Sequence, residues 1–438
     1  MPILTEQQAR ELVQSILKLS SADEIMITIR GSHSGNIRFA RNTVSTTGDS
    51  SNLTISIVSV FGKRSGSAST NEYDQDALKR TVKMSEDIAR LAPENPESMP
   101  MTGPQQFAKA ITWSEATAAI DPEFRAQAAF KSIEAAMNEN CTAAGFLEDN
   151  ASFIAIGNNT GLFAYNKSTG GDFTITVRTP DEKGSGYARQ SFTQAADLNT
   201  AKATHKAIQK AKSSANVQEL SPGKYTVILE PIATGDLIPL LISAMDARSA
   251  DEGRSYFGKR GQGNRIGEKL FSELVTIYSD PFNADSPSST FTSEGLPVTK
   301  VTWIEKGVLQ NLPYSRYWAA QKSVKPLPRP DGIIMPGSDK SVEELIRGTE
   351  KGILVSHFWY IRPVSAQQLL YTGLTRDGVF YIENGRIKFP VKNFRFNESP
   401  ANMLINLEAL GATERVGNNI LPAMKIRDFN FTSVSDAV

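Results

Sequence analysis

The chain has 438 residues, of which 40% are hydrophobic and 21% are charged. A chain of this length exceeds one ordinary hydrophobic core, so we expect two domains, residues 1–220 and 221–438. Lys and Arg number 47, as do Asp and Glu, and the formal net charge is zero. Because general nucleic-acid binding needs a basic surface, this balance argues against a nucleic-acid partner.

The cysteine content and the N-terminus bear on the cellular compartment. Cys141 is the single cysteine, so no intramolecular disulfide can form, which suits a reducing compartment. The segment 1–16 lacks the basic start and continuous apolar core of a signal peptide. No apolar run approaches the ~20 residues of a membrane span. We therefore expect a cytoplasmic protein that does not contact a membrane.

The first half of the chain alternates between helix and strand patterns. Thr5 followed by Gln8 resembles a capping box and predicts the start of a helix. Pro122 suits the first turn of a second strong helix. The pattern predicts an α+β N-terminal domain built as helix and sheet layers. Its expected helices are 73–91, 121–138 and 199–215, and its expected strands include 24–30, 36–44, 53–61, 152–156 and 162–165.

The second half is richer in strand patterns. A helix is expected over 234–247, and from residue 274 onward short strands and turns dominate. Asn384-Gly385 between apolar runs is a strong hairpin signal. We therefore expect a β-rich C-terminal domain, barrel-like or sandwich-like. Its expected strands include 225–229, 298–305, 352–358, 378–383 and 386–391.

Metal-dependent hydrolysis needs three or four ligands in close proximity. The three histidines lie far apart, and neither H-E-x-x-H nor H-E-x-x-x-H occurs. Carboxylates alone can hold a hard cation, and several follow or end the helix expected over 234–247. Salt bridges with Arg248 and Arg254 are the simpler interpretation of these groups. The acidic candidates are Asp246, Asp251, Glu252 and Glu268.

An aromatic run could line a groove for an extended peptide. Phe358, Trp359 and Tyr360 are consecutive and precede Arg362. Tyr314, Tyr317 and Trp318 could extend the same groove, although aromatic residues more often fill the core of a sheet. The candidate peptide-binding residues are Trp359, Tyr360 and Arg376.

Five segments together resemble the TldD/PmbA family, also called TldD/TldE and historically labelled modulators of DNA gyrase. Each segment alone is a weak signal, but they occur in the family's order across nearly the whole chain. The segments are Arg38–Asn42, Asn158–Gly161, Asn264–Glu268, Glu294–Pro297 and Thr372–Gly385.

The resemblance implies an α+β N-terminal domain followed by a β-rich domain. It also implies that active relatives are zinc metallopeptidases acting on unfolded or extended peptides. Their ligands are two histidines of H-E-x-x-x-H and a later cysteine. By position the first motif falls on Pro239–Ala244, which reads P-L-L-I-S-A, and no cysteine lies between residues 411 and 422. The chain thus resembles a metal-free PmbA/TldE-like or TldD-related branch.

The sequence leaves three functions open. The first is a non-catalytic subunit of a TldD-type metalloprotease that acts on unfolded peptides. This chain would carry no cofactor, zinc would sit only in a TldD-like partner, and a homodimer is the other possible assembly. The second is a peptidase with an unfamiliar site at the acidic candidates. The third is a peptide-binding module that acts alone.

Overall fold

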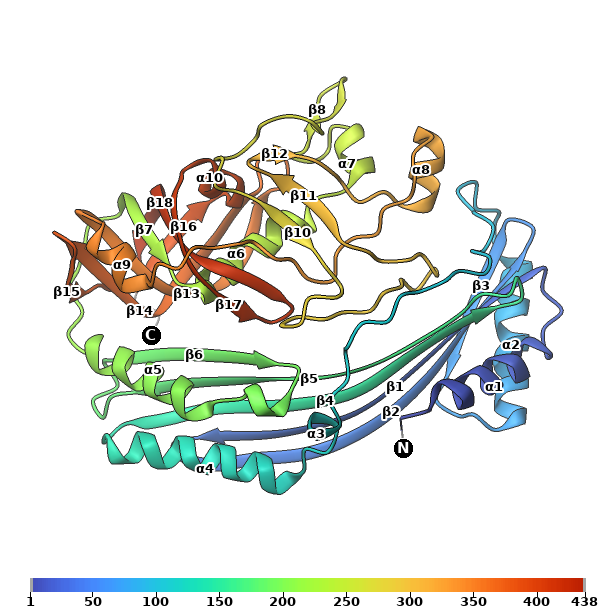
Figure 1. Ribbon diagram of the computed structural model, residues 1–438, viewed down its shortest axis with the longest axis horizontal. Coiled ribbons are helices and arrows are strands. Elements are labelled where there is room, and N and C mark those ends of the chain that lie inside the picture. Colours follow the sequence, from blue (N-terminus) through green and yellow to red (C-terminus); the bar gives the residue numbers. More distant parts are fainter. Residues whose placement is uncertain (1–2, 436–438) are drawn as a thin grey trace.

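The structure, a computed structural model, describes residues 3–435. Figure 1 shows an elongated sheet with its helices in the lower part of the view and a β-rich body above it. The lower part is formed by the first half of the chain and the upper body by the second half. The expected α+β organisation is confirmed.

The N-terminal sheet has six antiparallel strands in the order β3-β2-β1-β4-β5-β6. Its strands are β1 (Glu24–Ala40), β2 (Thr43–Phe61), β3 (Arg64–Thr70), β4 (Thr142–Asn158), β5 (Phe163–Arg178) and β6 (Ser185–Phe192). The accompanying helices are α1 (Glu6–Leu17), α2 (Gln75–Leu91), α3 (Glu115–Ala118), α4 (Pro122–Asn138) and α5 (Thr200–Ser213), with a 3-10 turn η1 (Ala195–Asp197).

The local signals explain where these helices begin. Thr5 and Gln8 form the expected capping box of α1. Asp121 caps α4, and Pro122 occupies its first turn. Because neither signal depends on distant residues, both helices could be expected from the sequence.

Alternation along β1 separates the two faces of the sheet. Ile25, Ile27 and Ile29 are buried in one core with residues of α1 and α2. The even-numbered Ser32 and Ser34 point to the opposite face and line a cleft. This is the period-two pattern of a strand with one apolar face.

The prediction of a separate strand over 36–44 is wrong. Residues up to Ala40 continue β1, because Ile37 and Phe39 extend its buried alternation. The chain reverses at Arg41 and Asn42, whose φ angles are 51° and 58°, and β2 begins at Thr43. Two left-handed residues match the type of turn that joins a tight hairpin.

The C-terminal sheet closes on itself, which matches the first of the two expected alternatives, a barrel-like or a sandwich-like domain. Strand β13 pairs with β7 on one side and with β14 on the other, and the remaining pairings run β7-β18-β16-β14. The strands of this sheet are β7 (Gly223–Leu229), β13 (Lys351–Ser365), β14 (Leu370–Glu383), β15 (Arg386–Pro390), β16 (Phe394–Glu398), β17 (Leu407–Val416) and β18 (Asn419–Val434).

Several of these strands are longer than the short strands expected from the sequence. Strand β14 has 14 residues and β18 has 16. The minor strands are β8 (Gly258–Lys259), β9 (Gly263–Asn264), β10 (Ile277–Ser279), β11 (Val301–Glu305) and β12 (Val308–Leu309). The helices are α6 (Pro231–Ser243), α7 (Ala247–Asp251), α8 (Arg316–Lys322), α9 (Val342–Arg347) and α10 (Pro400–Ile405).

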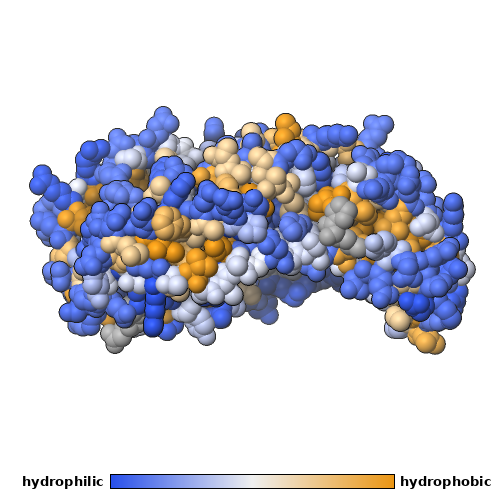
Figure 2. Space-filling model, turned by 90° about the horizontal axis from the view of Figure 1, so that it is seen from below, coloured by the Kyte–Doolittle hydropathy of each residue, from blue (hydrophilic) through white to orange (hydrophobic). Residues whose placement is uncertain are grey.

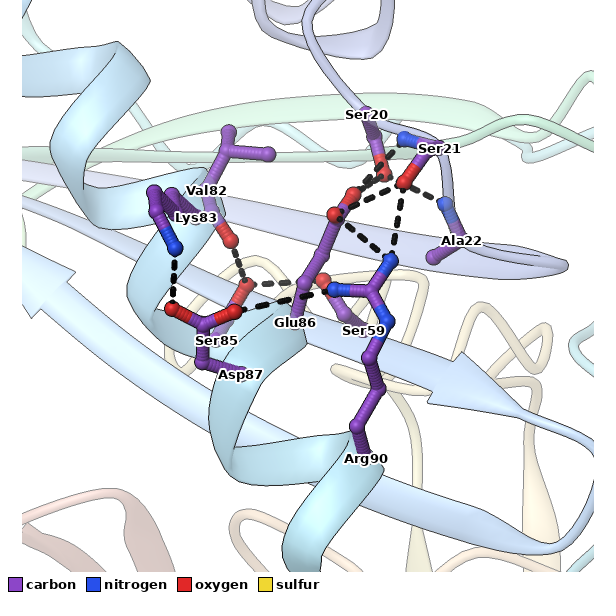
Figure 3. Close-up of polar contacts among 10 residues, drawn as sticks. All are labelled: Ser20, Ser21, Ala22, Ser59, Val82, Lys83, Ser85, Glu86, Asp87 and Arg90. Carbon is purple, nitrogen blue, oxygen red and sulfur yellow. Dashed lines mark hydrogen bonds and ion pairs between the residues drawn. The ribbon is translucent and has the colours of Figure 1, made fainter.

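The buried carboxylate of Glu86 ties α2 to the loop that follows α1 (Figure 3). It accepts hydrogen bonds from the Ser20 hydroxyl at 2.8 Å and the Ser21 amide at 2.7 Å, and pairs with Arg90 at 3.4 Å. Burial raises the pKa of Glu86, but the serine bonds and Arg90 outweigh burial and leave that pKa below its usual value. The group therefore has a structural role.

A second buried charge fixes α4 to the sheet. The Arg125 guanidinium is fully buried and lies 2.8 Å from Asp149 Oδ1 and 2.5 Å from Asp49 Oδ1. It crosses Gly35 so closely that a Cβ on Gly35 would lie 1.8 Å from Arg125 Nη1. Only glycine leaves room for this ion pair.

We expect Arg125→Ala to lower the free energy of unfolding by about 3–5 kcal/mol, because it leaves the buried Asp149 carboxylate without its partner. Urea unfolding measures the change. The control Arg80→Ala removes an exposed pair with Glu72 and should cost less than about 1 kcal/mol. Equal losses for the two variants would contradict this account of Arg125.

Candidate functional site

A large polar cleft lies between the N-terminal sheet and the β-rich body. Its volume is about 800 Å³. One wall is the sheet face opposite the helices, and the other wall comes from loops of the second half of the chain. Small polar side chains of the sheet wall are Ser32, Ser34, Asn52, Thr54, Asn150, Ser152, Asn166 and Ser168.

Hydrogen bonds across neighbouring strands order this wall. Asn150 donates to the Ser34 hydroxyl at 2.7 Å, and the Ser152 and Ser168 hydroxyls lie 3.1 Å apart. Such a face offers many donors and acceptors but few large side chains, which suits contact with a peptide backbone. The cleft was not predicted from the sequence, although alternate Ser, Thr and Asn residues along four strands indicate a polar sheet face.

One end of the cleft is charged. Arg189 of β6 donates from Nε to both carboxylate oxygens of Asp172 at 3.0 Å, and Arg415 donates to Thr193 Oγ1 at 2.6 Å. Burial lowers the pKa of Arg189, but Asp172 outweighs burial and leaves that pKa raised. At this end the bond from Arg415 to Thr193 joins the two halves of the chain, and the ion pair between Arg189 and Asp172 lies within the first half.

The α6 helix carries the segment where the resemblance expects metal ligands. It begins at Pro231 and ends at Ser243, several residues earlier at each end than the helix expected over 234–247. The side chains of Pro239–Ala244 are apolar except for one hydroxyl, and Leu241 and Ile242 lie in the core. Zinc binds through nitrogen, sulfur or carboxylate oxygen, so this donor set does not fit zinc.

The described residues, 3–435, contain no group of three or more His, Cys, Asp or Glu side chains placed to hold a metal ion. His33 lies on the exposed part of β1 and His205 on the exposed face of α5. His357 is buried in β13. The three histidines therefore lie on three different elements, and no step through a metal can be derived for this chain.

Asp236 is the acidic side chain of α6 and lies one turn before that segment. Its Oδ2 accepts a hydrogen bond from the Phe358 amide at 2.8 Å, which joins α6 to β13. Burial raises the pKa of Asp236 to about 7, while the Phe358 bond and Arg189 act in the opposite direction. A buried carboxyl that titrates near neutrality is a recognised mark of functional sites.

Next to Asp236, a buried network connects the two halves of the chain. The Asp377 carboxylate lies 2.9 Å from His357 Nε2 and accepts a hydrogen bond from the Ser185 hydroxyl. The His357 ring stacks on Tyr187 of β6, with centroids 4.4 Å apart. Burial lowers the pKa of His357 to about 3, so the neutral imidazole donates to the carboxylate.

This network contains a serine, a histidine and an aspartate, but they are not arranged as a catalytic triad with a serine nucleophile. A serine nucleophile needs its base within hydrogen-bond reach. Here Ser185 bonds to Asp377 and not to His357. The three residues therefore serve as a junction between β6 and the β13–β14 hairpin.

The four acidic candidates have separate partners. Asp246 caps α7 through the Ser249 amide, and Glu252 pairs with Arg248 and Arg254 as the sequence suggested. Asp251 accepts from Trp318 Nε1 at 2.7 Å. Glu268 pairs with Lys259 and Arg265. Each of the four carboxylates thus has a hydrogen-bond or ion-pair partner nearby in the structure.

The peptide-binding candidates form an exposed stack on the β13–β14 hairpin. Trp359 and Tyr360 are 49% and 53% exposed, so the expectation that they fill the core is wrong, although Phe358 is buried. Arg376 lies 4.4 Å from the Trp359 ring centre and Arg362 4.3 Å from that of Tyr360. We call these four residues, Trp359, Tyr360, Arg362 and Arg376, the aromatic stack.

A backbone irregularity explains the exposure. The pairing of β13 with β14 shifts between Trp359 and Arg362, and Tyr360 has a φ of 54°. Such a bulge redirects side chains that regular alternation would bury. Trp318, with Tyr314 and Tyr317, lies instead beside Asp251 and Arg248, and no ring contact among residues 3–435 connects these three to Trp359.

Three models of one family match the chain in sequence order. The model for domain 1 of the PmbA/TldA metallopeptidases matches residues 27–89, and the central-domain model matches 116–215. The C-terminal-domain model matches 222–433. The chain belongs to the PmbA/TldD family. These matches divide the first half into two segments, although its sheet is continuous through both.

Two relatives of this PmbA/TldD member carry metalloprotease names. A metalloprotease of Methanothermobacter thermautotrophicus is 26% identical over 216 residues, and the match spans 44% of each chain, less than half of that relative's length. Metalloprotease PmbA of Escherichia coli O157:H7 is 24% identical over 387 residues, 83% of each chain. The chain is therefore related to metallopeptidases.

Solved structures show the same fold at low identity. A candidate modulator of DNA gyrase from Thermotoga maritima has a TM-score of 0.87 at 18% identity, covering 97% of this chain and all of that chain. A second, from Bacteroides thetaiotaomicron, has 0.87 at 20%, covering 99% and 100%. TldE from Thermococcus kodakarensis has 0.86 at 18%, covering 97% and 100%.

We expect Asp236→Asn to remove a pH dependence of stability. The folded pKa of about 7 exceeds the unfolded value of ~3.9, so the folded state holds the extra proton between these values. Stability therefore falls as pH rises from about 4 to about 7, by up to ~1.4 kcal/mol per unit. Asn cannot titrate but can still accept from Phe358.

Urea unfolding of both proteins between pH 4 and pH 8 measures this difference. The variant should gain stability relative to the parent as pH rises to 7 and stay level above it. Ser243→Ala, which changes a side chain of α6 that does not titrate, is the control and should run parallel to the parent. A parallel profile for Asp236→Asn would contradict the assignment.

Proposed function

We propose that this chain is a metal-free, peptide-binding subunit of a TldD-type proteolytic assembly in the cytoplasm. In this proposal a metal-bearing relative supplies the zinc and the hydrolysis. This chain binds unfolded or extended polypeptide and needs no cofactor of its own. Related chains with metalloprotease names support the choice of reaction.

One observation carries the proposal. The chain has the family fold and a large cleft between its two halves, while the segment Pro239–Ala244 offers no zinc ligand. A cleft without a zinc-binding donor set is what a binding subunit needs. The separate partners of Asp246, Asp251, Glu252 and Glu268 leave the alternative of an unfamiliar peptidase site without support.

The cleft wall suggests how an extended peptide binds. Its serine, threonine and asparagine side chains can exchange hydrogen bonds with a main chain regardless of peptide sequence. Arg189 and Arg415 at one end are each held by a neighbouring residue, so their side chains are already ordered before a peptide arrives. This arrangement favours unfolded segments over folded domains.

The aromatic stack provides a second surface whose chemistry suits contact with an unfolded polypeptide. Trp359 and Tyr360 are about half exposed, and the guanidinium groups of Arg362 and Arg376 lie against their rings. Aromatic and arginine side chains are the most common anchors of protein interfaces. We propose that the stack contacts apolar and acidic residues of the bound polypeptide.

We expect Trp359→Ala to weaken binding of an unfolded peptide by about tenfold, since an anchor residue typically contributes more than 1 kcal/mol. Tyr360→Ala should act in the same direction. Tyr73→Ala is the matched control, because Tyr73 is 57% exposed and Tyr360 is 53% exposed. Fluorescence anisotropy with a labelled, reduced and unfolded protein fragment measures the affinities. Equal effects at Tyr360 and Tyr73 would reject the role of the stack.

The subunit role predicts substoichiometric zinc in the purified chain and no peptidase activity when the chain is alone. Elemental analysis and cleavage of unfolded casein are the two measurements. Addition of a metal-bearing family member should produce activity that exceeds the activity of that member alone. One tightly bound zinc per chain, or cleavage by this chain alone, would overturn the proposal.

A further inference from the structure

The polar cleft is closed at one end by the body of the second half. Tyr187, Arg189 and Ser191 are alternate residues of β6, so they lie on one face of the sheet. Arg189 and Ser191 line the cleft, whereas Tyr187 is covered by the stacked ring of His357. The cleft therefore ends beside Arg189, where the contact with the β13–β14 hairpin begins.

Arg415 of β17 lies at this closed end and bonds to uncharged partners. Its Nη1 donates to Thr193 Oγ1 at 2.6 Å and to the main-chain oxygen of Asp285 at 2.7 Å. Its Nε donates to the Gly417 oxygen at 3.0 Å. An arginine has five N–H donors, and these bonds use three of them. The two donors of Nη2 have no acceptor within residues 3–435 and remain available to a ligand.

The charge of Arg415 is not balanced by an ion pair in the described part of the chain. Asp172, at the same end of the cleft, already accepts from Arg189 and from the Ser191 hydroxyl at 2.6 Å. Burial lowers the pKa of Arg415, and the attraction of three aspartates does not offset burial. Because a guanidinium stays protonated in proteins, this end of the cleft holds a cation that suits a carboxylate ligand.

The wall of the cleft sets the length of peptide that reaches Arg415. Residues from Asn166 to Asp172 of β5 line the cleft, and six steps of a strand span about 20 Å. About six residues of an extended peptide therefore fit along β5. Figure 2, the view from below, shows a mainly hydrophilic surface with separate hydrophobic patches, so that face has no continuous apolar track for an extended chain.

We propose that Arg415 binds the C-terminal carboxylate of the polypeptide in the cleft. The ligand class is an unfolded chain with a free C-terminus, whose last residues lie along β5. An acidic side chain offers the same charge, but the stack of Tyr187 on His357 blocks the chain that would continue beyond it. This inference rests on the proposed function and deepens it, because it defines which end of the polypeptide the cleft receives.

Fluorescence anisotropy of the full chain with three labelled peptides of one uncharged sequence tests the inference. The first peptide ends in a free carboxylate and the second in an amide. The third also ends in an amide but has aspartate as its last residue. We expect the free carboxylate to bind about tenfold more tightly than the amide, because the amide loses the charge-assisted bond to Arg415. The third peptide should bind like the second.

Variants assign the difference to Arg415. Arg415→Gln removes the charge and should reduce the ratio of the first two affinities to about twofold or less. Arg415→Lys keeps the charge and should restore part of that ratio. Arg427→Gln is the matched control, since it removes the same charge from an exposed position of β18 that does not line the cleft. It should leave the ratio unchanged.

The outcomes separate this inference from the proposed function. Equal binding of the free carboxylate and the amide by the parent chain would overturn the inference and leave peptide binding intact. Binding of none of the three peptides would overturn both. Tight binding of the third peptide, or a ratio that persists in Arg415→Gln, would refute the C-terminal carboxylate as the ligand of Arg415. The comparison of peptides on the parent chain decides the inference even if a variant fails to fold.

Discussion

The contact between β6 and the β13–β14 hairpin determines how the two halves of this protein face each other. Ser185 and Tyr187 of β6 meet Asp377 and His357 there, and Lys210 of α5 pairs with Glu230 just before α6. Asp377, Lys210 and Glu230 are buried, so each of these three charges depends on its polar partner at the junction. Because Glu230 directly precedes α6, its pair with Lys210 fixes the start of that helix against α5.

The junction also explains how α6 is held in its place in the fold. Asp236 holds α6 to β13 through the Phe358 amide, and the apolar side of α6 packs into the barrel core through Leu237 and Leu241. Hydrophobic burial of this kind needs no metal. The helix therefore keeps its place through packing and the hydrogen bond between Asp236 and Phe358.

Local signals in the sequence were sufficient for the elements that depend on neighbouring residues. The capping box of α1, Pro122 in α4 and the Asn384-Gly385 turn are of this kind. Pairing between distant strands could not be read in the same way, and neither could the barrel closure nor the Asp377 network. The exposure of Trp359 depends on a bulge, which overrides the preference of aromatic residues for a sheet core.

We propose that peptide binding by this chain does not need a metal. Titration of the full chain with a labelled unfolded protein fragment, before and after exhaustive chelation, tests that claim most directly. We expect the same Kd in both conditions, because the proposed contacts come from serine, threonine, asparagine and arginine side chains. Loss of binding after chelation, with recovery on addition of zinc, would contradict the account.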